Sequence, residues 1–223
     1  MPQANAPLLA RSLYQEGCIA AHALDLLGDR WALLVIRELM LGAKRFSLLR
    51  AGMPGISASV LTQRLEGLEA GGILRRVTLP EPAEVQVYEL TPLGQGVWPV
   101  LAALCRWGAQ LPGHDPSRHI SPTALMLSMR VMVMSERAAL APIRAGFDLG
   151  RERFRGRLAD GLWQVERGAA KGDIVFSGTA NAVAAAIYGR RSLREWIADD
   201  SSRFLGDPDL GQCFVDQFRL RGA

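Results

Sequence analysis

The sequence is poor in the residues that most enzymes use for chemistry. Its 223 residues include only three histidines and three cysteines. The cysteines are odd in number and too widely spaced to form a metal-ligand pair or a disulfide framework; they are Cys18, Cys105 and Cys213. No histidine follows residue 119, and the second half contains no nucleophile elbow, phosphate loop or clear carboxylate pair. We therefore expect no catalytic residues, no metal site and no cofactor.

Long hydrophobic runs are also absent. No stretch approaches the roughly 18 residues that a membrane span needs. The first 17 residues show neither the basic cluster nor the sustained apolar segment of a secretory signal. The composition, with 49% hydrophobic and 22% charged residues, is typical of a globular chain with a full core. These features predict a cytoplasmic protein without a membrane partner.

Neither sign of charge is in large excess. The formal net charge is +4, which permits an anionic partner without requiring one. Up to Gly113 the chain carries 10 basic and 9 acidic residues, so the first half is not globally basic. Any case for nucleic-acid binding there has to come from the local arrangement of side chains.

Breaker and polar residues over 111–119 separate two apolar, periodic regions. This segment predicts a domain boundary, with domains at 1–111 and 121–223 joined by a linker at 112–120. The first region predicts the order helix, helix, short helix, helix, strand, strand, helix. Its expected helix caps are Asp29, before a helix from Arg30 to about Leu41, Ser57 and Thr91. The second predicts a helix, several strands in a small antiparallel sheet, and further helices, with caps at Ser121, Thr179, Ser192 and Asp207. The expected fold class is therefore α+β.

The fourth predicted helix divides into an apolar and a polar side. Ser57 can cap it, and two glycines at 71–72 end it. Its buried stripe, at i, i+4 and i+7, consists of Leu61, Leu65 and Leu68. Opposite, near the N-terminal end, lie hydrogen-bonding side chains that can read base edges: Ser59, Thr62 and Gln63. Taken alone, the pattern fits an ordinary surface helix equally well.

The segment after this helix favours a DNA-binding interpretation. Two β-rich runs, 73–78 and 85–90, flank a proline-containing turn and predict a hairpin. A helix followed by such a hairpin has the order of a winged helix-turn-helix, whose second helix enters the major groove. Amides near Ser57 can hold a phosphate. The expected phosphate contacts are Lys44, Arg45, Arg75 and Arg76, with Arg64 suited to a phosphate or an ion pair.

Several segments of the first half resemble the HxlR family of bacterial winged-helix regulators. They are 18–31 (CIAAHALDLLGDRW), 45–47 (RFS) with 55–57 (GIS), 60–65 (VLTQRL) and 88–94 (YELTPLG). They occur in the family's order over residues 15–110. The resemblance implies a homodimer, formed by the first and last helices of the domain, on a near-palindromic double-stranded DNA operator.

Three positions depart from the family pattern. Ile19 stands where proline often follows the cysteine, and Leu48 stands where a glutamate is common. Glu84 lies near the wing tip, where a basic residue is frequent. The last departure removes an expected phosphate contact from the tip.

The helix expected over 92–110 supports dimerisation independently. Its apolar side chains cover more than one face: Val97, Trp98, Val100, Leu101, Leu104, Cys105 and Trp107. A helix apolar over so wide an arc buries two sides. One side can pack on its own domain and the other on a second copy. Packing of that other side against the second half of the same chain is the alternative.

Cys18, just before the first predicted helix, has two interpretations. Some relatives in the family sense oxidants or electrophiles through a cysteine in this place, and a helix N-terminus can lower the pKa of a thiol. The alternative, which the absence of nearby Lys or Arg favours, is a small buried apolar residue at the dimer interface.

The second half resembles, in its order of elements over 121–221, the sterol-carrier-protein-like fold. That resemblance implies a cavity for an apolar ligand. The helix expected after Ser121 is rich in methionine, a side chain that often lines adaptable binding surfaces. Candidate ligand-binding residues are Met126, Met129 and Met132. The commoner alternative is that this helix is simply core.

Together these features predict a dimeric, sequence-specific transcriptional regulator. We expect a repressor that responds to a small apolar ligand bound by the second domain. Three alternatives remain: a lipid or small-molecule carrier whose winged helix serves only dimerisation, a redox-sensing regulator acting through Cys18, and, least supported, an enzyme.

Overall fold

The computed structural model describes residues 14–80, 84–134, 141–198 and 203–220. The chain divides between Leu101 and Ala102 into two compact units. The division falls inside helix α6 (Trp98–Gly108), ahead of the predicted linker. Residues 109–121 form turns and loop.

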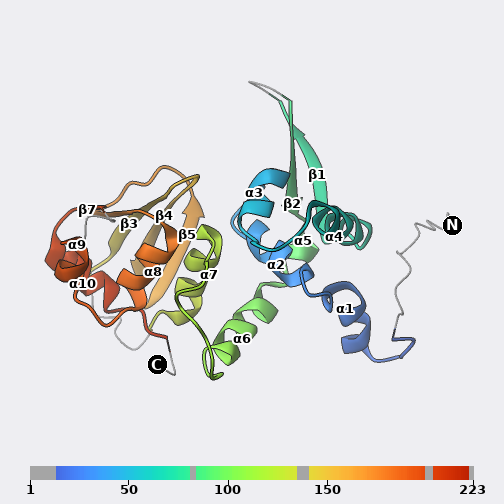
Figure 1. Cartoon of the computed structure of the whole chain (residues 1–223), viewed down its shortest axis with the longest axis horizontal. Coiled ribbons are helices and arrows are strands. Elements are labelled where there is room, and N and C mark those ends of the chain that lie inside the picture. The colour runs from blue at the N-terminus through green and yellow to red at the C-terminus, as the bar shows by residue number, and fades with distance from the viewer. Residues whose placement is uncertain (1–13, 81–83, 135–140, 199–202, 221–223) are drawn as a thin grey trace. The chain divides into compact units, whose positions relative to one another are not determined.

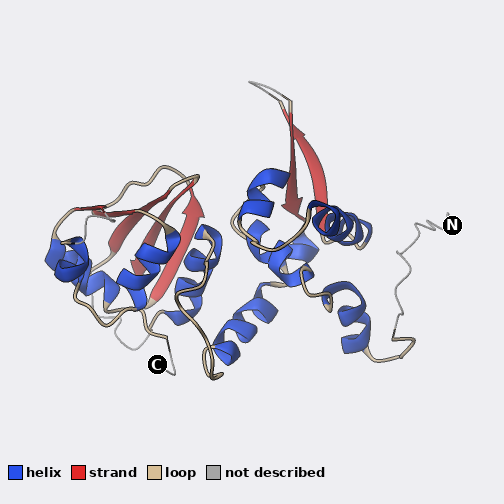
Figure 2. Ribbon diagram, viewed as in Figure 1, coloured by secondary structure: helices blue, strands red, loops and turns tan. Residues whose placement is uncertain are grey.

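Helices and one hairpin make up the first unit, in the predicted order. Its elements are α1 (Ile19–Leu27), α2 (Ala32–Leu39), α3 (Phe46–Ala51), α4 (Ala58–Ala70), β1 (Leu74–Leu79), β2 (Val85–Leu90), α5 (Pro92–Gln95) and the start of α6. The antiparallel hairpin of β1 and β2 projects from the helices (Figures 1 and 2). This is the winged helix-turn-helix that the sequence predicts.

The core of the first unit lies between α2 and α4. Val35, Ile36 and Leu39 of α2 are completely buried. Leu61 and Leu65 of α4 are equally buried, and Leu68 is 2% exposed. Burying one such side chain stabilises the fold by about 1.5–3 kcal/mol. The apolar stripe of α4 therefore fixes which side of this helix faces solvent.

A close backbone approach joins the hairpin to α5. Thr91 caps α5 by accepting a hydrogen bond from the amide of Gly94, and its own hydroxyl donates to the carbonyl of Gly72 at 2.6 Å. A Cβ atom at Gly94 would lie 2.1 Å from the carbonyl oxygen of Ile73, so this position requires glycine. The contact fixes the base of the wing against the helices.

Two predicted helices differ from the observed ones. The helix expected from Arg30 begins at Ala32, and the carboxylate of Asp29, the expected cap, forms an ion pair with Arg64. The helix expected over 92–110 is divided into α5 and α6 at Gly96. Gly94 and Gly96 lie within one turn of each other, and glycine weakens a helix by about 1 kcal/mol relative to alanine.

The second unit is a five-stranded sheet with helices. Its elements are α7 (Pro122–Met132), β3 (Ile143–Leu149), β4 (Glu152–Ala159), β5 (Leu162–Arg167), β6 (Ile174–Ser177), α8 (Ala180–Tyr188), α9 (Leu193–Ile197), β7 (Arg203–Leu205) and α10 (Pro208–Val215). The strand order is β5-β4-β3-β6-β7. Every neighbouring pair is antiparallel except β3 and β6, which are parallel.

The expectation of a purely antiparallel sheet is therefore wrong for one pair. The chain leaves β3 through β4 and β5 on one side and returns to the other side as β6, running in the direction of β3. Strand β7 is also absent from the predicted elements. It has only three residues, too few to show an alternating pattern.

The two faces of this sheet differ in character. Helices α7, α8 and α10 lie over one face (Figure 1). The aromatic core of the unit consists of Phe147, Trp163, Phe176, Phe214 and Phe218, with ring centroids 5.0–6.3 Å apart in the contacting pairs. Residues in alternate positions of β3, β4 and β5 point to the other face, and several of them are exposed, among them Arg144, Arg155 and Gln164.

Candidate nucleic-acid interface

The solvent side of α4 carries the hydrogen-bonding side chains expected there. Ser59, Thr62 and Gln63 are all exposed near the N-terminal end of the helix. Ser57 caps the helix by accepting a hydrogen bond from the amide of Val60 at 3.2 Å, and its hydroxyl lies 3.0 Å from that of Ser59. Hydroxyl and amide groups in this position can hydrogen-bond to base edges in a major groove. The geometry needed for base contacts is therefore present.

Arg64 lies at the flank of this surface and is engaged with the protein. Its guanidinium forms an ion pair with Asp29, and its side chain is 14% exposed. The same guanidinium donates to the amide oxygen of Gln63 at 3.1 Å. Of the two roles that the sequence allows, phosphate contact or ion pair, the structure therefore shows the ion pair.

Lys44 requires a correction, because it cannot reach a phosphate from where it lies. Its backbone is hydrogen-bonded to that of Tyr88 in both directions, at 3.0 and 2.8 Å, and its side chain is fully buried. The ammonium donates to Oε2 of Glu38 at 2.8 Å, and Arg37 donates to Oε1 of the same carboxylate at 2.8 Å. Lys44 is thus part of the core of the first unit.

The sequence analysis missed Glu38 altogether. This residue lies on the apolar helix α2 between Ile36 and Leu39, and its side chain is completely buried. A single acidic residue among buried apolar positions was the available signal, because such a charge needs a partner in the interior. Two basic residues close along the chain supply partners, the adjacent Arg37 and, six positions on, Lys44.

The remaining basic candidates are exposed. Arg45 precedes α3 and is exposed. Arg75 on β1 pairs with Glu89 directly across the hairpin at 2.7 Å, and its side chain is 68% exposed. Arg76 pairs with Glu69 of α4 at 2.9 Å. A phosphate at either wing arginine therefore competes with a carboxylate that is already bound.

A row of apolar side chains is exposed along α6 and beyond it. Val100, Leu104, Trp107 and Leu111 recur at i, i+4, i+7 and i+11, and each is 42–61% exposed. Two apolar residues of the same stretch that are not part of this row, Val97 and Leu101, are buried. Helix α1 also exposes Ile19 at 87% and Leu24 at 48%. Contiguous exposed apolar surface of this kind marks interaction sites.

Cys18 lies at the N-cap of α1 and is exposed. Hydrogen bonds from the amides of Ala21 and Ala20 lower the pKa of its thiol below the usual value. This is the effect that a helix N-terminus has on a thiolate.

The methionines proposed as ligand contacts lie in the interior of the second unit. Met126 and Met129 are completely buried and Met132 is 7% exposed. Among the described residues, no cluster of His, Cys, Asp and Glu could hold a metal ion. No helix in the described ranges is long and apolar enough to cross a membrane.

Comparison with known proteins identifies the first half of the chain. The model of the HxlR-like helix-turn-helix family matches residues 26–115. The uncharacterized HTH-type transcriptional regulator YvaP of Bacillus subtilis is 36% identical over 89 residues, which are 40% of this chain and 82% of that protein. The regulator sll1512 of Synechocystis is 40% identical over 112 residues, 49% of this chain and 79% of its own length.

Among solved structures, the reduced form of the transcriptional regulator YodB from B. subtilis is 35% identical, with a TM-score of 0.40; the match covers 45% of this chain and all of that one. The relatives YvaP and sll1512 are named as transcriptional regulators and not as enzymes, and this chain spans most of their length. The winged helix described above lies within the matched region. The chain therefore belongs to the HxlR-like helix-turn-helix family of transcriptional regulators.

Proposed function

We propose that this regulator acts as a homodimer on a near-palindromic double-stranded DNA operator, with α4 in the major groove. The observation that carries the proposal is the solvent face of α4. Ser59, Thr62 and Gln63 are exposed on a helix whose opposite side is anchored by buried leucines, immediately before a two-stranded wing. A helix that is held rigidly and presents short polar side chains meets the requirement for direct readout.

The proposed contacts fall into two classes. Ser59, Thr62 and Gln63 contact base edges and specify the sequence. Arg45, Arg75 and Arg76 contact phosphates and set the position of the protein, together with the amides at the start of α4. Phosphate contacts release counterions, so binding weakens as salt rises, with a slope near 0.9 for each phosphate.

Gel shifts across a salt series, with the DNA upstream of the protein's own gene, test this division. Gln63→Ala weakens specific binding by about 1–3 kcal/mol and leaves binding to random duplex unchanged. Arg75→Ala weakens both and lowers the salt slope by about 0.9. Gln95→Ala, at an exposed position of α5, is the matched control and binds like the wild type.

A lack of any shift at low salt, or equal affinity for all duplexes, contradicts sequence-specific binding. It would favour the alternative of a carrier protein whose winged helix serves only dimerisation. Operator binding that is unchanged in Gln63→Ala contradicts the orientation proposed for α4.

We propose that the exposed apolar row at Val100, Leu104, Trp107 and Leu111 forms the dimer contact, together with α1. The spacing of four and three residues places Val100, Leu104 and Trp107 on one face of α6, and Leu111 continues the row in the turn after the helix. A twofold contact uses the same patch on both copies, so one such row is sufficient. The dimer fixes the spacing of the two α4 helices, and half-sites on B-DNA lie about 34–36 Å apart.

For the second unit we propose the role of a ligand sensor with a sterol-carrier-like fold, and for the whole protein the role of a repressor. The support is the set of flexible, buried methionines at 126, 129 and 132 on α7. An apolar ligand that binds the two DNA-binding states unequally shifts operator affinity, typically by about 1–3 kcal/mol. An operator-bound dimer represses by covering the promoter.

The ligand proposal is tested by melting the full chain with fatty acids, sterols and aromatic hydrophobes. Deletion of residues 121–223 is the matching control for operator binding. If no compound raises the melting temperature and the truncated chain binds operator like the full one, the second unit is not a sensor. A promoter–reporter assay with and without the protein gives the sign of regulation.

Cys18 supports a second candidate function, regulation by thiol oxidation. Its exposure gives the access that a sensor thiol needs, and the hydrogen bonds from the amides of Ala21 and Ala20 shift its pKa in the direction that favours the thiolate. Under this proposal, peroxide or quinone weakens operator binding by the wild type. The Cys18→Ser variant binds operator equally well with and without these reagents. An equal response of the wild type and Cys18→Ser contradicts it.

A further inference from the structure

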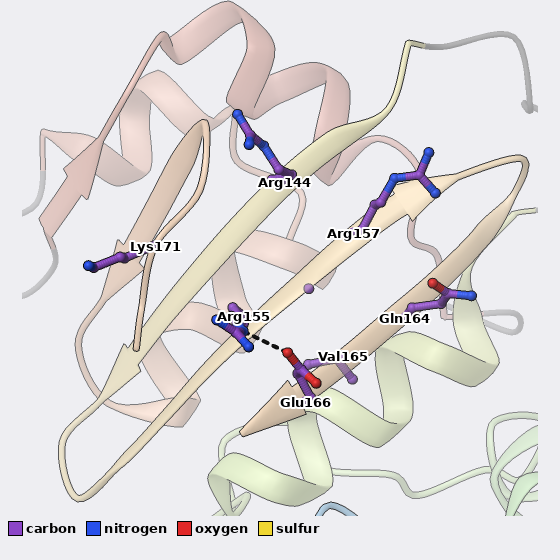
Figure 3. A pocket seen from close by; sticks show the side chains of 8 residues that line it. Arg144, Arg155, Arg157, Gln164, Val165, Glu166 and Lys171 are labelled. Carbon is purple, nitrogen blue, oxygen red and sulfur yellow. Dashed lines mark hydrogen bonds and ion pairs between the residues drawn. The ribbon is translucent and has the colours of Figure 1, made fainter. Parts of the chain in front are cut away.

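The open face of the second unit's sheet has a basic hollow that the proposed function does not use. The hollow measures about 390 Å³ and lies over β3, β4, β5 and the loop before β6. It is lined by Arg144, Arg155, Gly156, Arg157, Gln164, Val165, Glu166 and Lys171. Figure 3 shows Arg144, Arg155 and Arg157 around the hollow and Lys171 at its edge, on the loop before β6, with its side chain directed outward; the dashed line marks the ion pair between Arg155 and Glu166.

Two arginines of this hollow stand side by side on neighbouring strands. Arg144 of β3 is directly opposite Arg157 of β4 in the sheet register. Like charges in directly opposite positions destabilise a sheet. On its other side Arg157 faces the uncharged Gln164 of β5. Within the described part of the chain, the side chain of Arg157 has no hydrogen-bonding or ion-pair partner, so the repulsion is relieved only on the side of Arg144, by Asp173.

The acidic groups present neutralise only part of the charge. Arg144 pairs with Asp173 at 2.7 Å, and Arg155 pairs with Glu166 at 2.6 Å. Arg157 and Lys171 have no acidic partner among the described residues. Four basic side chains line the hollow and two carboxylates pair with them, so the hollow has a surplus of two positive charges.

The position of Lys171 is built into the fold. A Cβ atom at Gly146 would lie 2.6 Å from the backbone nitrogen of Lys171, and one at Gly172 would lie 2.5 Å from the carbonyl oxygen of Arg144. These two glycines let the loop before β6 pack directly on β3. The amide of Asp173 then donates to the carbonyl of Arg144 at 2.8 Å. Lys171 is thus held next to the hollow by the backbone.

We propose that this hollow binds a phosphate monoester. A phosphate monoester carries about −1.5 to −2 charges at pH 7, which matches the surplus of two. The guanidinium of Arg157 can bind two phosphate oxygens at once, and the exposed, flexible side chain of Lys171 can turn in from the edge to add a compact point charge. The amide of Gln164 is a further hydrogen-bond donor at the same place.

The size of the hollow indicates an organic phosphate and not the bare ion. Its volume lies within the range of about 300–1,000 Å³ that is usual for small-molecule sites. The alkyl stems of the arginines provide apolar surface for the organic part. The site lies outside the winged helix, so the proposal of phosphate binding can be tested independently of operator binding.

Calorimetric titration of the full chain with phenyl phosphate, without DNA, tests the proposal. Potassium chloride at matched ionic strength gives the background. Arg157→Gln and Lys171→Gln each weaken binding about tenfold, which corresponds to about 1.4 kcal/mol. Arg151→Gln, an exposed change in the turn between β3 and β4, is the matched control and leaves binding unchanged. Without ligand, Arg157→Gln melts no lower than the wild type, because it removes a repulsion.

Four results would overturn the proposal. They are the absence of heat beyond the chloride background, an equal loss in Arg151→Gln, tighter binding of succinate than of phenyl phosphate, and unchanged binding in both test variants. A separate measurement distinguishes a DNA surface. If Arg157→Gln with Lys171→Gln lowers the salt slope for random duplex by about 1.8 while phenyl phosphate does not bind, the face contacts a DNA backbone and the proposal is wrong.

Discussion

Replacing Lys44 by methionine separates the structural role of this residue from the DNA contact that its neighbourhood in the sequence suggests. The ammonium of Lys44 and the carboxylate of Glu38 are both completely buried and lie 2.8 Å apart. Removing one partner of a buried pair usually costs about 3–5 kcal/mol, because the other charge stays in the interior. Arg37, whose side chain is 23% exposed, keeps its 2.8 Å contact with Glu38 and reduces this cost. We therefore expect a loss at the lower end, about 3 kcal/mol.

Such a loss lowers the melting temperature of a unit of this size by roughly 10–20 °C. Because the chain has two units, a single melting curve does not isolate the effect. Hydrogen exchange with mass spectrometry, read on peptides of α2 and α4 and on those of β3 and β4, assigns the loss to the first unit. Adding Glu38→Gln to Lys44→Met restores part of it, because the uncompensated charge disappears while an acceptor for Arg37 remains.

Arg45→Met is the matched control, since it changes the next residue in the same way at an exposed position. We expect its stability to stay within about 0.5 kcal/mol of the wild type. The salt slope for operator binding falls by about 0.9 in Arg45→Met. In Lys44→Met, measured under conditions in which the protein is folded, the salt slope is unchanged. A Lys44→Met variant as stable as the wild type but with the lower slope would refute the structural assignment.

Three further predictions concern the first unit and α6. Gly94→Ala should destabilise the first unit strongly, because its Cβ would collide with the carbonyl of Ile73. Gly67→Ala, where a Cβ meets nothing within 4 Å, should stabilise the unit by about 0.5–1 kcal/mol in urea unfolding. Leu104→Glu should convert the proposed dimer to a monomer in light scattering after size exclusion, and an unchanged mass would argue against this interface. The third prediction uses a variant in which the other two cysteines are serine. The alkylation rate of Cys18 should reach its plateau at a lower pH in the folded chain than in the urea-unfolded chain, because hydrogen bonds from α1 lower the pKa of the thiol. Identical pH profiles for the folded and unfolded chains would contradict this.

Local signals in the sequence predicted most of the element boundaries. Six of the seven expected caps accept a backbone hydrogen bond at the start of a helix, the exception being Asp29; the six are Ser57, Thr91, Ser121, Thr179, Ser192 and Asp207. A cap depends on residues only two or three positions away, so it can be predicted without knowing the tertiary fold. The polar face of α4 could be predicted for the same reason, since helical periodicity alone separates Gln63 from Leu61.

The sequence does not reveal which side chains and strands pair across different elements. The burial of Lys44 depends on Glu38, a residue on another element, and the choice between the two roles left open for Arg64 depends on Asp29. The parallel pairing of β3 and β6 depends on the path of the whole sheet. The helical periodicity of α4 gives no information about these partners, and for that reason a basic residue near a recognition helix was mistaken for a phosphate contact.

The carboxylates that hold Arg75 and Arg76 have a consequence for how a regulator of this kind would search a chromosome. Both wing arginines have an internal counterion in the free protein, Glu89 and Glu69 respectively. On a random duplex each wing arginine would exchange one ion pair for another, so its net gain from a phosphate is smaller than that of an arginine without an internal counterion, though it is not zero. In the proposed operator complex, base contacts by α4 would hold the wing in place while the exchange is completed. We therefore expect shorter residence on random duplex than a wing with unpaired arginines would give, because acidic side chains of the protein compete with each phosphate.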